Sequence, residues 1–183
     1  MIIERLQALR AEMKKRGIDI YVIPTADFHE SEYVGAYFKA RAYITGFSGS
    51  AGTAVVTQNE AGLWTDGRYF IQAERQLEGT TVDLYRMGEE GVPTVEEFIK
   101  KELSENGCLG FDGRVVNNKW GQKLSKIAEE KNAKLFVEED LVGLIWSDRP
   151  ALAKSVPFLL EEKYSGKSTA EKLADVRKKM TET

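Results

Sequence analysis

The sequence is poor in the residues that most often bind metals or form covalent links. Cys108 is the only cysteine among 183 residues, so no disulfide can form within the chain. A lone cysteine usually behaves as a small buried hydrophobic residue, and a chain without disulfides favours a cytoplasmic protein. His29 is the only histidine, and the sequence has neither a His-x-x-x-His nor a Cys-x-x-Cys motif. This scarcity of ligands argues against a zinc site built by this chain alone.

Long apolar runs and clusters of positive charge are also missing. No run of about 18 apolar residues occurs, and residues 1–17 carry charged side chains within their apolar pattern, which argues against a membrane span and a signal peptide. The chain has 26 Lys and Arg against 29 Asp and Glu, interspersed along its length, for a net charge of −3. This balance argues against a nucleic-acid-binding surface, which needs clustered basic residues.

What is present suits a globular protein, because 42% of the residues are hydrophobic and 10% are aromatic. The most organised stretch is residues 43–69. Gly46, Gly49 and Gly52 recur every three residues and indicate a tightly turned loop, in which Gly46 and Gly52 are expected to serve backbone conformation. The runs 53–56 and 61–64, joined by a polar turn, predict an antiparallel β-hairpin.

Helices and short strands are predicted on both sides of this hairpin. Residues 2–16 have helical spacing and end at Gly17, residues 18–23 form a nearly continuous apolar run, and residues 33–43 read as a loop with a short helix. The pattern predicts further helices over 67–78, 93–103 and 117–131, and strands over 80–85, 108–111 and 135–137. We therefore expect an α/β fold with a mixed sheet of five or six strands, flanked by about four helices.

The composition changes near Asp148-Arg149-Pro150, which marks a boundary in the chain. We expect residues 1–150 to form one domain and residues 151–167 to form a linker. Residues 168–183 begin with Ser168-Thr169-Ala170-Glu171, which has the form of a capping box, and continue with an apolar helical face. We interpret this last segment as the first helix of a second, truncated domain.

Two common catalytic motifs are not matched. Gly46-Phe47-Ser48-Gly49 lacks the spacing of a nucleophile elbow. Gly49-Ser50-Ala51-Gly52 lacks the Lys-Ser/Thr ending of a phosphate-binding loop and leads into a predicted strand, so it is better interpreted as a loop that enters the hairpin.

Several blocks together resemble the N-terminal region of Xaa-Pro aminopeptidases in the creatinase and prolidase family, most closely the long, three-domain cytosolic type. The blocks follow one another in the same order over nearly the whole chain. They are Ser31-Glu32-Tyr33, Arg41 and the segments 43–54, 64–69 and 145–150.

The resemblance implies a ribonuclease-H-like mixed sheet in the N-terminal domain of an enzyme that removes the residue preceding proline. In that family, two metal ions, commonly manganese, are held in a C-terminal domain by two Asp, one His and two Glu. Nothing after Pro150 can supply that set, so no catalytic or metal-binding residue is carried over and the fragment is expected to be inactive. The implied partners are proline-containing peptides and a second copy of the chain in a homodimer.

The same resemblance points to the loop over residues 27–33 as part of the substrate entrance, reaching a neighbouring subunit. The candidates are His29, Glu32, Tyr33, Arg41 and Arg68, which offer a titratable ring, a carboxylate for a peptide ammonium group and guanidinium groups for a carboxylate. Three of them also have a simpler interpretation: His29 is solvated, Arg68 braces its turn through a salt bridge, and Tyr33 belongs to the core, as Phe47 and Trp64 do.

Two other classes of function remain open at this point. The domain is also compatible with a dimerisation module that makes no contact with substrate. A third possibility is a stand-alone peptide-binding protein that has kept a peptidase-like fold. The length of the natural gene product distinguishes this last possibility from the enzyme.

Overall fold

The computed structural model describes residues 1–182 and divides the chain into two compact units, Met1–Leu152 and the segment from Ala153 onward. The first unit contains a six-stranded sheet, in which the strands lie in the order β4 (Asp83–Arg86), β3 (Ala61–Thr65), β2 (Thr53–Thr57), β1 (Ile20–Pro24), β5 (Cys108–Phe111) and β6 (Lys134–Phe136). The β1–β2 and β2–β3 pairs are antiparallel, whereas β1–β5, β3–β4 and β5–β6 are parallel. The predicted mixed α/β sheet is therefore confirmed.

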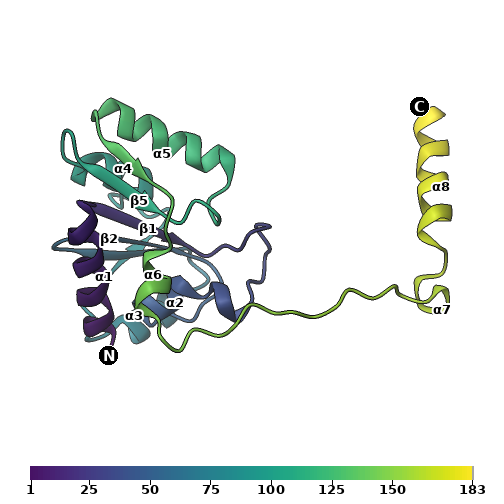
Figure 1. Cartoon of the computed structure of the whole chain (residues 1–183), viewed down its shortest axis with the longest axis horizontal. Coiled ribbons are helices and arrows are strands. Elements are labelled where there is room, and N and C mark those ends of the chain that lie inside the picture. Colours follow the sequence, from purple (N-terminus) through teal and green to yellow (C-terminus); the bar gives the residue numbers. More distant parts are fainter. Residues whose placement is uncertain (183) are drawn as a thin grey trace. The chain divides into compact units, whose positions relative to one another are not determined.

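Two hydrophobic cores cover the two faces of this sheet, and strand β1 (Ile20–Pro24) contributes to both. Successive strand side chains point to opposite faces, so Tyr21 and Ile23 join one core while Ile20 and Val22 join the other. Helices α1, α2, α3 and α6 cover the first face, and α4 and α5 cover the second (Figure 1). Burial on both faces explains why β1 reads as a continuous apolar run.

The N-terminal helix α1 (Ile2–Arg16) forms as its sequence predicts. Leu6, Leu9 and Met13 recur on one face and are fully buried against the sheet. The helix ends at Gly17, whose φ of 66° lies in the left-handed region that favours glycine. Lys14, Lys15 and Arg16 lie in the last turn, where positive charge is favoured by the helix dipole.

The predicted hairpin is formed by β2 (Thr53–Thr57) and β3 (Ala61–Thr65), with Thr53 opposite Trp64. The loop that leads into it begins at Gly46, the C-cap of α2 (Ala40–Thr45), with a φ of 79°. The loop ends at Gly52, whose φ is 151°. Both glycines therefore adopt the positive φ expected of them.

The remaining elements complete the first unit, and most follow the predicted order with shifted bounds. In place of the predicted helix over 67–78 the structure has α3 (Phe70–Leu77), and the strand predicted over 80–85 is β4 (Asp83–Arg86). The other elements are η1 (Ala36–Phe38), α4 (Val95–Glu102), β5 (Cys108–Phe111), α5 (Asn118–Glu130), β6 (Lys134–Phe136) and α6 (Leu141–Ile145).

One expectation about an aromatic residue is wrong, and the expected number of helices needs refinement. Tyr33 is 77% exposed, so its assignment to the core is wrong, whereas Phe47 and Trp64 are fully buried as predicted. The first unit has six α-helices and one short 3-10 helix, where about four helices were expected to flank the sheet. The two additional α-helices, α2 and α6, have six and five residues, which is too short for a helical apolar pattern to be recognised.

The second unit contains α7 (Glu162–Ser165) and α8 (Thr169–Thr181). Ser168 caps α8 in the predicted capping box with Glu171, whose N–H lies 3.2 Å from the Ser168 hydroxyl. The apolar side chains of α8, Leu173, Val176 and Met180, are exposed by 47%, 54% and 71%. The end of the helix predicted over 168–183 lies outside the described residues.

Candidate functional site

The loop over residues 27–33 is shaped by one carboxylate. Oδ1 of Asp27 accepts hydrogen bonds from the backbone N–H groups of Ser31 and His29, at 3.0 and 2.9 Å. These two bonds lower the pKa of Asp27 below its ordinary value of 3.8, and the bond from Ser31 has the larger effect. Between them Glu30 adopts a φ of 56°, so the loop folds back on itself.

Contacts on either side attach this loop to the body of the domain. The Glu30 carboxylate accepts a hydrogen bond from the side-chain amide of Asn117, the N-cap of α5. Phe28 packs edge-to-face on Phe38 with ring centroids 4.7 Å apart, and the Arg114 guanidinium lies 5.5 Å from the centre of the Phe28 ring. The loop is therefore held between η1 and α5.

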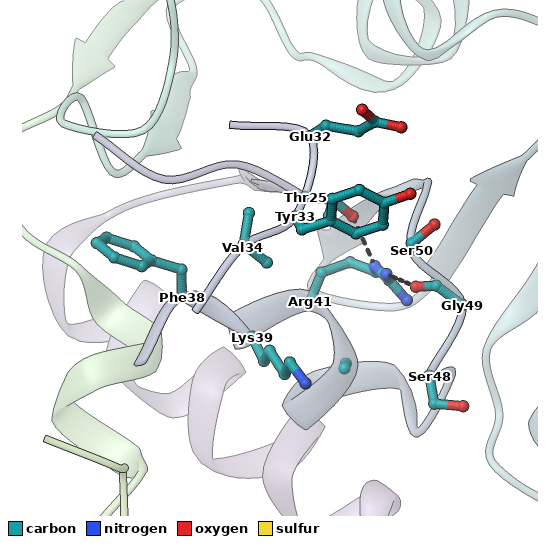
Figure 2. Close-up of a pocket in the computed structure, with 11 residues that line it drawn as sticks. Thr25, Glu32, Tyr33, Val34, Phe38, Lys39, Arg41, Ser48, Gly49 and Ser50 are labelled. Atoms are coloured by element: carbon teal, nitrogen blue, oxygen red, sulfur yellow. Dashed lines mark hydrogen bonds between the residues drawn. The ribbon is translucent and has the colours of Figure 1, made fainter. Parts of the chain in front are cut away.

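A pocket of about 150 Å³ opens between this loop, helix α2 and the glycine-rich loop before β2 (Figure 2). We call it the Arg41 pocket, after the charged side chain that extends into it from α2. Its lining residues are Thr25, Glu32, Tyr33, Val34, Phe38, Lys39, Arg41, Ala42, Ser48, Gly49 and Ser50.

Arg41 is only 3% exposed and holds the glycine-rich loop in place. Its Nε donates to the hydroxyl of Thr25 at 3.0 Å, Nη1 donates to the carbonyl of Phe47 at 2.6 Å, and Nη2 donates to the carbonyl of Gly49. Figure 2 shows the guanidinium group reaching from α2 to Thr25 and Gly49. Burial lowers the pKa of Arg41 to about 10, which still leaves the group charged at neutral pH.

Arg68 has a different environment, because it lies in the turn between β3 and α3 and its side chain is 70% exposed. Its Nε and Nη2 both donate to the carboxylate of Asp66 at 2.8 Å, in a bidentate arrangement that raises the pKa of Arg68 above its ordinary value. The adjacent Tyr69 hydroxyl lies 2.6 Å from the hydroxyl of Ser50, which connects this turn to the rim of the Arg41 pocket.

A wider groove of about 420 Å³ lies at the end of the sheet, on the other side of the 27–33 loop. It is lined by Glu30, Ser31 and Glu32 from the loop, by Ser50–Thr53 and Asp66 beside the hairpin, and by Met87 and Trp120. Thr25, Glu32 and Ser50 line both the groove and the Arg41 pocket. The two hollows therefore share one rim.

The structure brings together three of the five predicted site residues. Glu32, Tyr33 and Arg41 line the Arg41 pocket, whereas the exposed His29 and Arg68 lie outside its lining. Arg41 is almost fully buried, and its guanidinium group binds two carbonyls and a hydroxyl of its own chain. The alternative prediction for Arg68, a salt bridge that braces its turn, is confirmed.

Sequence reasoning missed the polar residues that complete the pocket, namely Thr25, Lys39, Ser48 and Ser50. The signal that could have found Ser48 and Ser50 was the glycine spacing of residues 46–52, which keeps hydroxyl side chains on an exposed, tightly turned loop. Lys39 and Thr25 carry no comparable local pattern.

The residues present do not fit the two-metal set of Xaa-Pro aminopeptidases. Over residues 1–182, no three His, Cys, Asp or Glu side chains come together in an arrangement that could hold a metal ion. We therefore assign no metal-binding role to the described residues.

Residues 5–143 match the family model of the creatinase/prolidase N-terminal domain, so the chain belongs to this family. The curated relatives are described as probable Xaa-Pro aminopeptidase P. Those of Neurospora crassa and Coprinopsis cinerea are 45% and 41% identical over 97% of this chain. The chain spans 26% and 29% of the lengths of these relatives, which is about a quarter to a third.

Solved structures show the same relationship. The X-prolyl aminopeptidase of Caenorhabditis elegans, described as a cytosolic enzyme with a di-nuclear active site, superposes on all of this chain with a TM-score of 0.86 at 31% identity, and 31% of its own chain is covered. The N-terminal domain of the cytoplasmic peptidase PepQ from Mycobacterium tuberculosis is 28% identical, with a TM-score of 0.55 over 78% of this chain and 98% of that one.

Proposed function

We propose that this chain serves as the non-catalytic N-terminal domain of a metal-dependent Xaa-Pro aminopeptidase, an enzyme that removes the residue preceding proline from peptides. The observation that carries this proposal is the extent of the similarity. The Neurospora crassa relative matches 97% of the chain, through both compact units, while the chain spans only 26% of that relative. We therefore expect the catalytic chemistry of such an enzyme to lie in the part of the protein that this chain does not cover.

In this proposal the domain shapes the entrance to a catalytic site that lies elsewhere. The 27–33 loop presents Glu32 and Tyr33 as exposed side chains above a pocket; the Asp27 carboxylate binds the loop backbone, and Asn117 binds the Glu30 side chain. An exposed carboxylate suits the ammonium end of a peptide, and a fixed backbone limits the entropy lost on binding. Functional side chains are often placed on loops that a rigid scaffold supports.

The proposal extends to the setting of the enzyme. We propose that it works in the cytoplasm as a homodimer, in which the loop of one copy contributes to the entrance of the other, and that a pair of divalent cations, manganese in the first instance, supplies the hydrolytic chemistry from the catalytic domain. The worm enzyme's description as cytosolic and di-nuclear supports the location and the metal pair. The homodimer and the manganese rest on family resemblance.

A domain exchange tests the proposal. The N-terminal region of the Neurospora crassa relative is replaced by this chain, and release of free arginine from the peptide Arg-Pro-Pro is measured in the presence of manganese. We expect the chimaera to retain activity within about tenfold of the unmodified relative, because nearly half of the aligned residues are identical. The matched control is the same relative without any N-terminal region.

A chimaera that folds and binds metal but is no more active than the truncated control would contradict the proposal. Analytical sedimentation of the same samples tests the proposed homodimer. An active chimaera that sediments as a monomer would contradict it.

A further inference from the structure

Among residues 1–182, the buried guanidinium group of Arg41 forms no salt bridge with an acidic side chain. Within residues 1–182, its hydrogen bonds go to one hydroxyl and two carbonyls, all of them neutral. The guanidinium carbon also lies 4.7 Å from the centre of the Phe47 ring, and Tyr69 interacts with the charge electrostatically. A buried Arg is ordinarily paired with an acidic group, because removal of a charge from water is costly.

This charge lies on the wall of a pocket rather than inside the packed core. Arg41 is among the residues that line the 150 Å³ space, and the three hydrogen bonds leave other N–H donors of the guanidinium group unused. Lys39 contributes a second cation to the lining, and Ser48 and Ser50 contribute exposed hydroxyl groups. The Ser48 hydroxyl already bonds Gln76 and the Ser50 hydroxyl bonds Tyr69, so the donors left for a small anion come from Arg41 and Lys39, while Glu32 places a carboxylate elsewhere in the lining.

The opposite part of the lining is apolar. Val34, Phe38 and Ala42 contribute hydrocarbon surface to the same pocket. A pocket with cationic donors and an adjoining apolar wall fits an organic carboxylate whose side chain is hydrophobic better than it fits a fully hydrated inorganic anion.

We propose that the Arg41 pocket binds the α-carboxylate of an apolar amino-acid residue, with the carboxylate beside Arg41 and Lys39 and the side chain against Val34 and Phe38. Two sources share this chemistry: a free amino acid and the C-terminal residue of a peptide. Both occur in a reaction that cuts peptides, so the expected ligand class rests on the proposed function, whereas the binding site rests on the geometry of this chain alone.

Titration of the full 183-residue chain followed by NMR tests the proposal. Leucine represents the free amino acid, Gly-Pro-Leu represents a peptide C-terminus, and leucinamide and inorganic phosphate are the controls. We expect saturable shifts of the backbone amides of Gly49 and Ser50 with leucine, with the tripeptide or with both, and the relative affinities identify the source. Leucinamide, which lacks the carboxylate, and phosphate, which lacks the apolar group, should bind at least about tenfold more weakly.

Variants assign the binding to this pocket. Lys39→Met should weaken leucine or tripeptide binding several-fold, and Ala42→Leu, which fills part of the cavity, should weaken it at least tenfold. Lys39 is exposed and Ala42 is only partly buried, so both variants are expected to fold, which the NMR spectrum verifies. Lys14→Met, the same substitution at an exposed position on α1, is the matched control and should leave binding unchanged.

Three results would overturn the proposal: no saturable shift with leucine or the tripeptide, equal binding of leucinamide or phosphate, or unchanged binding in folded Ala42→Leu. None of these results depends on peptidase activity. Failure of this inference is therefore distinguishable from failure of the proposed function, which the domain exchange tests.

Discussion

A Cβ atom added to Gly52 would lie only 2.8 Å from the carbonyl oxygen of Trp64 on the neighbouring strand. The hairpin thus requires glycine for close backbone approach as well as for its φ of 151°. We expect Gly52→Ala to lower the free energy of unfolding by about 2 kcal/mol and the melting temperature by roughly 5 °C. Gly46→Ala should cost about 1 kcal/mol, because its φ is 79° but its nearest contact is the flexible side chain of Ile2.

Thermal unfolding followed by circular dichroism measures both effects. Gly121→Ala is the matched control, since Gly121 lies within α5 and a Cβ there meets its nearest atom at 3.9 Å. Alanine should be neutral or stabilising at this helical position. Unchanged melting of Gly52→Ala would show that the loop has been misinterpreted.

The chain alone is expected to have no aminopeptidase activity. Two-metal hydrolysis requires converging carboxylate and histidine ligands, and no such group forms over residues 1–182. Incubation with manganese and Arg-Pro-Pro, followed by quantification of free arginine, checks this expectation. Arginine release that persists through purification and exceeds a buffer control would direct attention back to the surroundings of His29.

Substitutions in the 27–33 loop should impair peptide hydrolysis by the active chimaera. We expect His29→Ala and Glu32→Ala to lower kcat/KM by about tenfold, because loss of one charged contact removes roughly 1.5 kcal/mol of binding free energy. Metal content and melting temperature should be unchanged, since both side chains are exposed.

Glu105→Ala is the control for these loop variants, because Glu105 is an exposed glutamate that precedes β5, at the opposite end of the sheet. Kinetics equal to those of the unmodified chimaera, on both short and long proline-containing peptides, would leave the loop with an architectural role only.

The carboxylate of Asp27 provides a pH-dependent test of loop order. Its folded-state pKa is lowered by the N–H groups of Ser31 and His29, so its contribution to stability is complete above the unfolded-state pKa of about 3.9. That contribution is lost as the pH falls through the lowered folded-state pKa. A carboxyl NMR titration should place this pKa below 3.8, and the amide shifts of His29 and Ser31 should titrate with it. A midpoint at or above 3.8 would contradict the two hydrogen bonds.

A buried ion pair between Asp140 and Arg149 fixes the end of the first unit. Their side chains are only 10% and 12% exposed, and Asp140 also caps α6 through the N–H of Gly143 at 2.9 Å. Asp140→Asn keeps a capping side chain but leaves the Arg149 charge without its partner, and we expect a loss of about 3 kcal/mol in denaturant unfolding.

The neighbouring Glu139→Ala is the control for the buried pair. Its carboxylate is 44% exposed and pairs with Arg16 at 2.6 Å, so its removal should cost less than about 1 kcal/mol. Equal effects of the two substitutions would mean that burial of the Asp140 pair contributes nothing.

Local patterns were sufficient to predict the elements whose structure depends on neighbouring residues. The hairpin followed from two short β-rich runs around a polar turn, and α1 followed from the spacing of Leu6, Leu9 and Met13 and from Gly17. Resemblance to a known family, rather than composition, supplied the prediction that the 27–33 loop contributes to the substrate entrance.

The parts that were missed depend on contacts between distant residues. Tyr33 is an aromatic residue of a type often found in cores. It is exposed because it lies on a surface loop whose shape is fixed by contacts of Asp27 and Glu30. Arg41 is a residue type usually found on the surface, but it is buried and donates to carbonyls six and eight positions further along the chain. Those carbonyls come within its reach only once the glycine-rich loop has formed. Neither environment is encoded in a short window of sequence.

The strand order also determines when each part of the sheet can assemble. Strands β1, β2 and β3 pair with their neighbours in the sequence, within residues 20–65, so their pairing closes shorter loops than the pairing of β1 with β5 does. Strand β5 must instead pair with β1 across a long separation, and the Asp19 carboxylate accepts the N–H of Cys108, 89 residues away. Because loop closure opposes distant contacts, the antiparallel half can form first and then act as the template for β5 and β6.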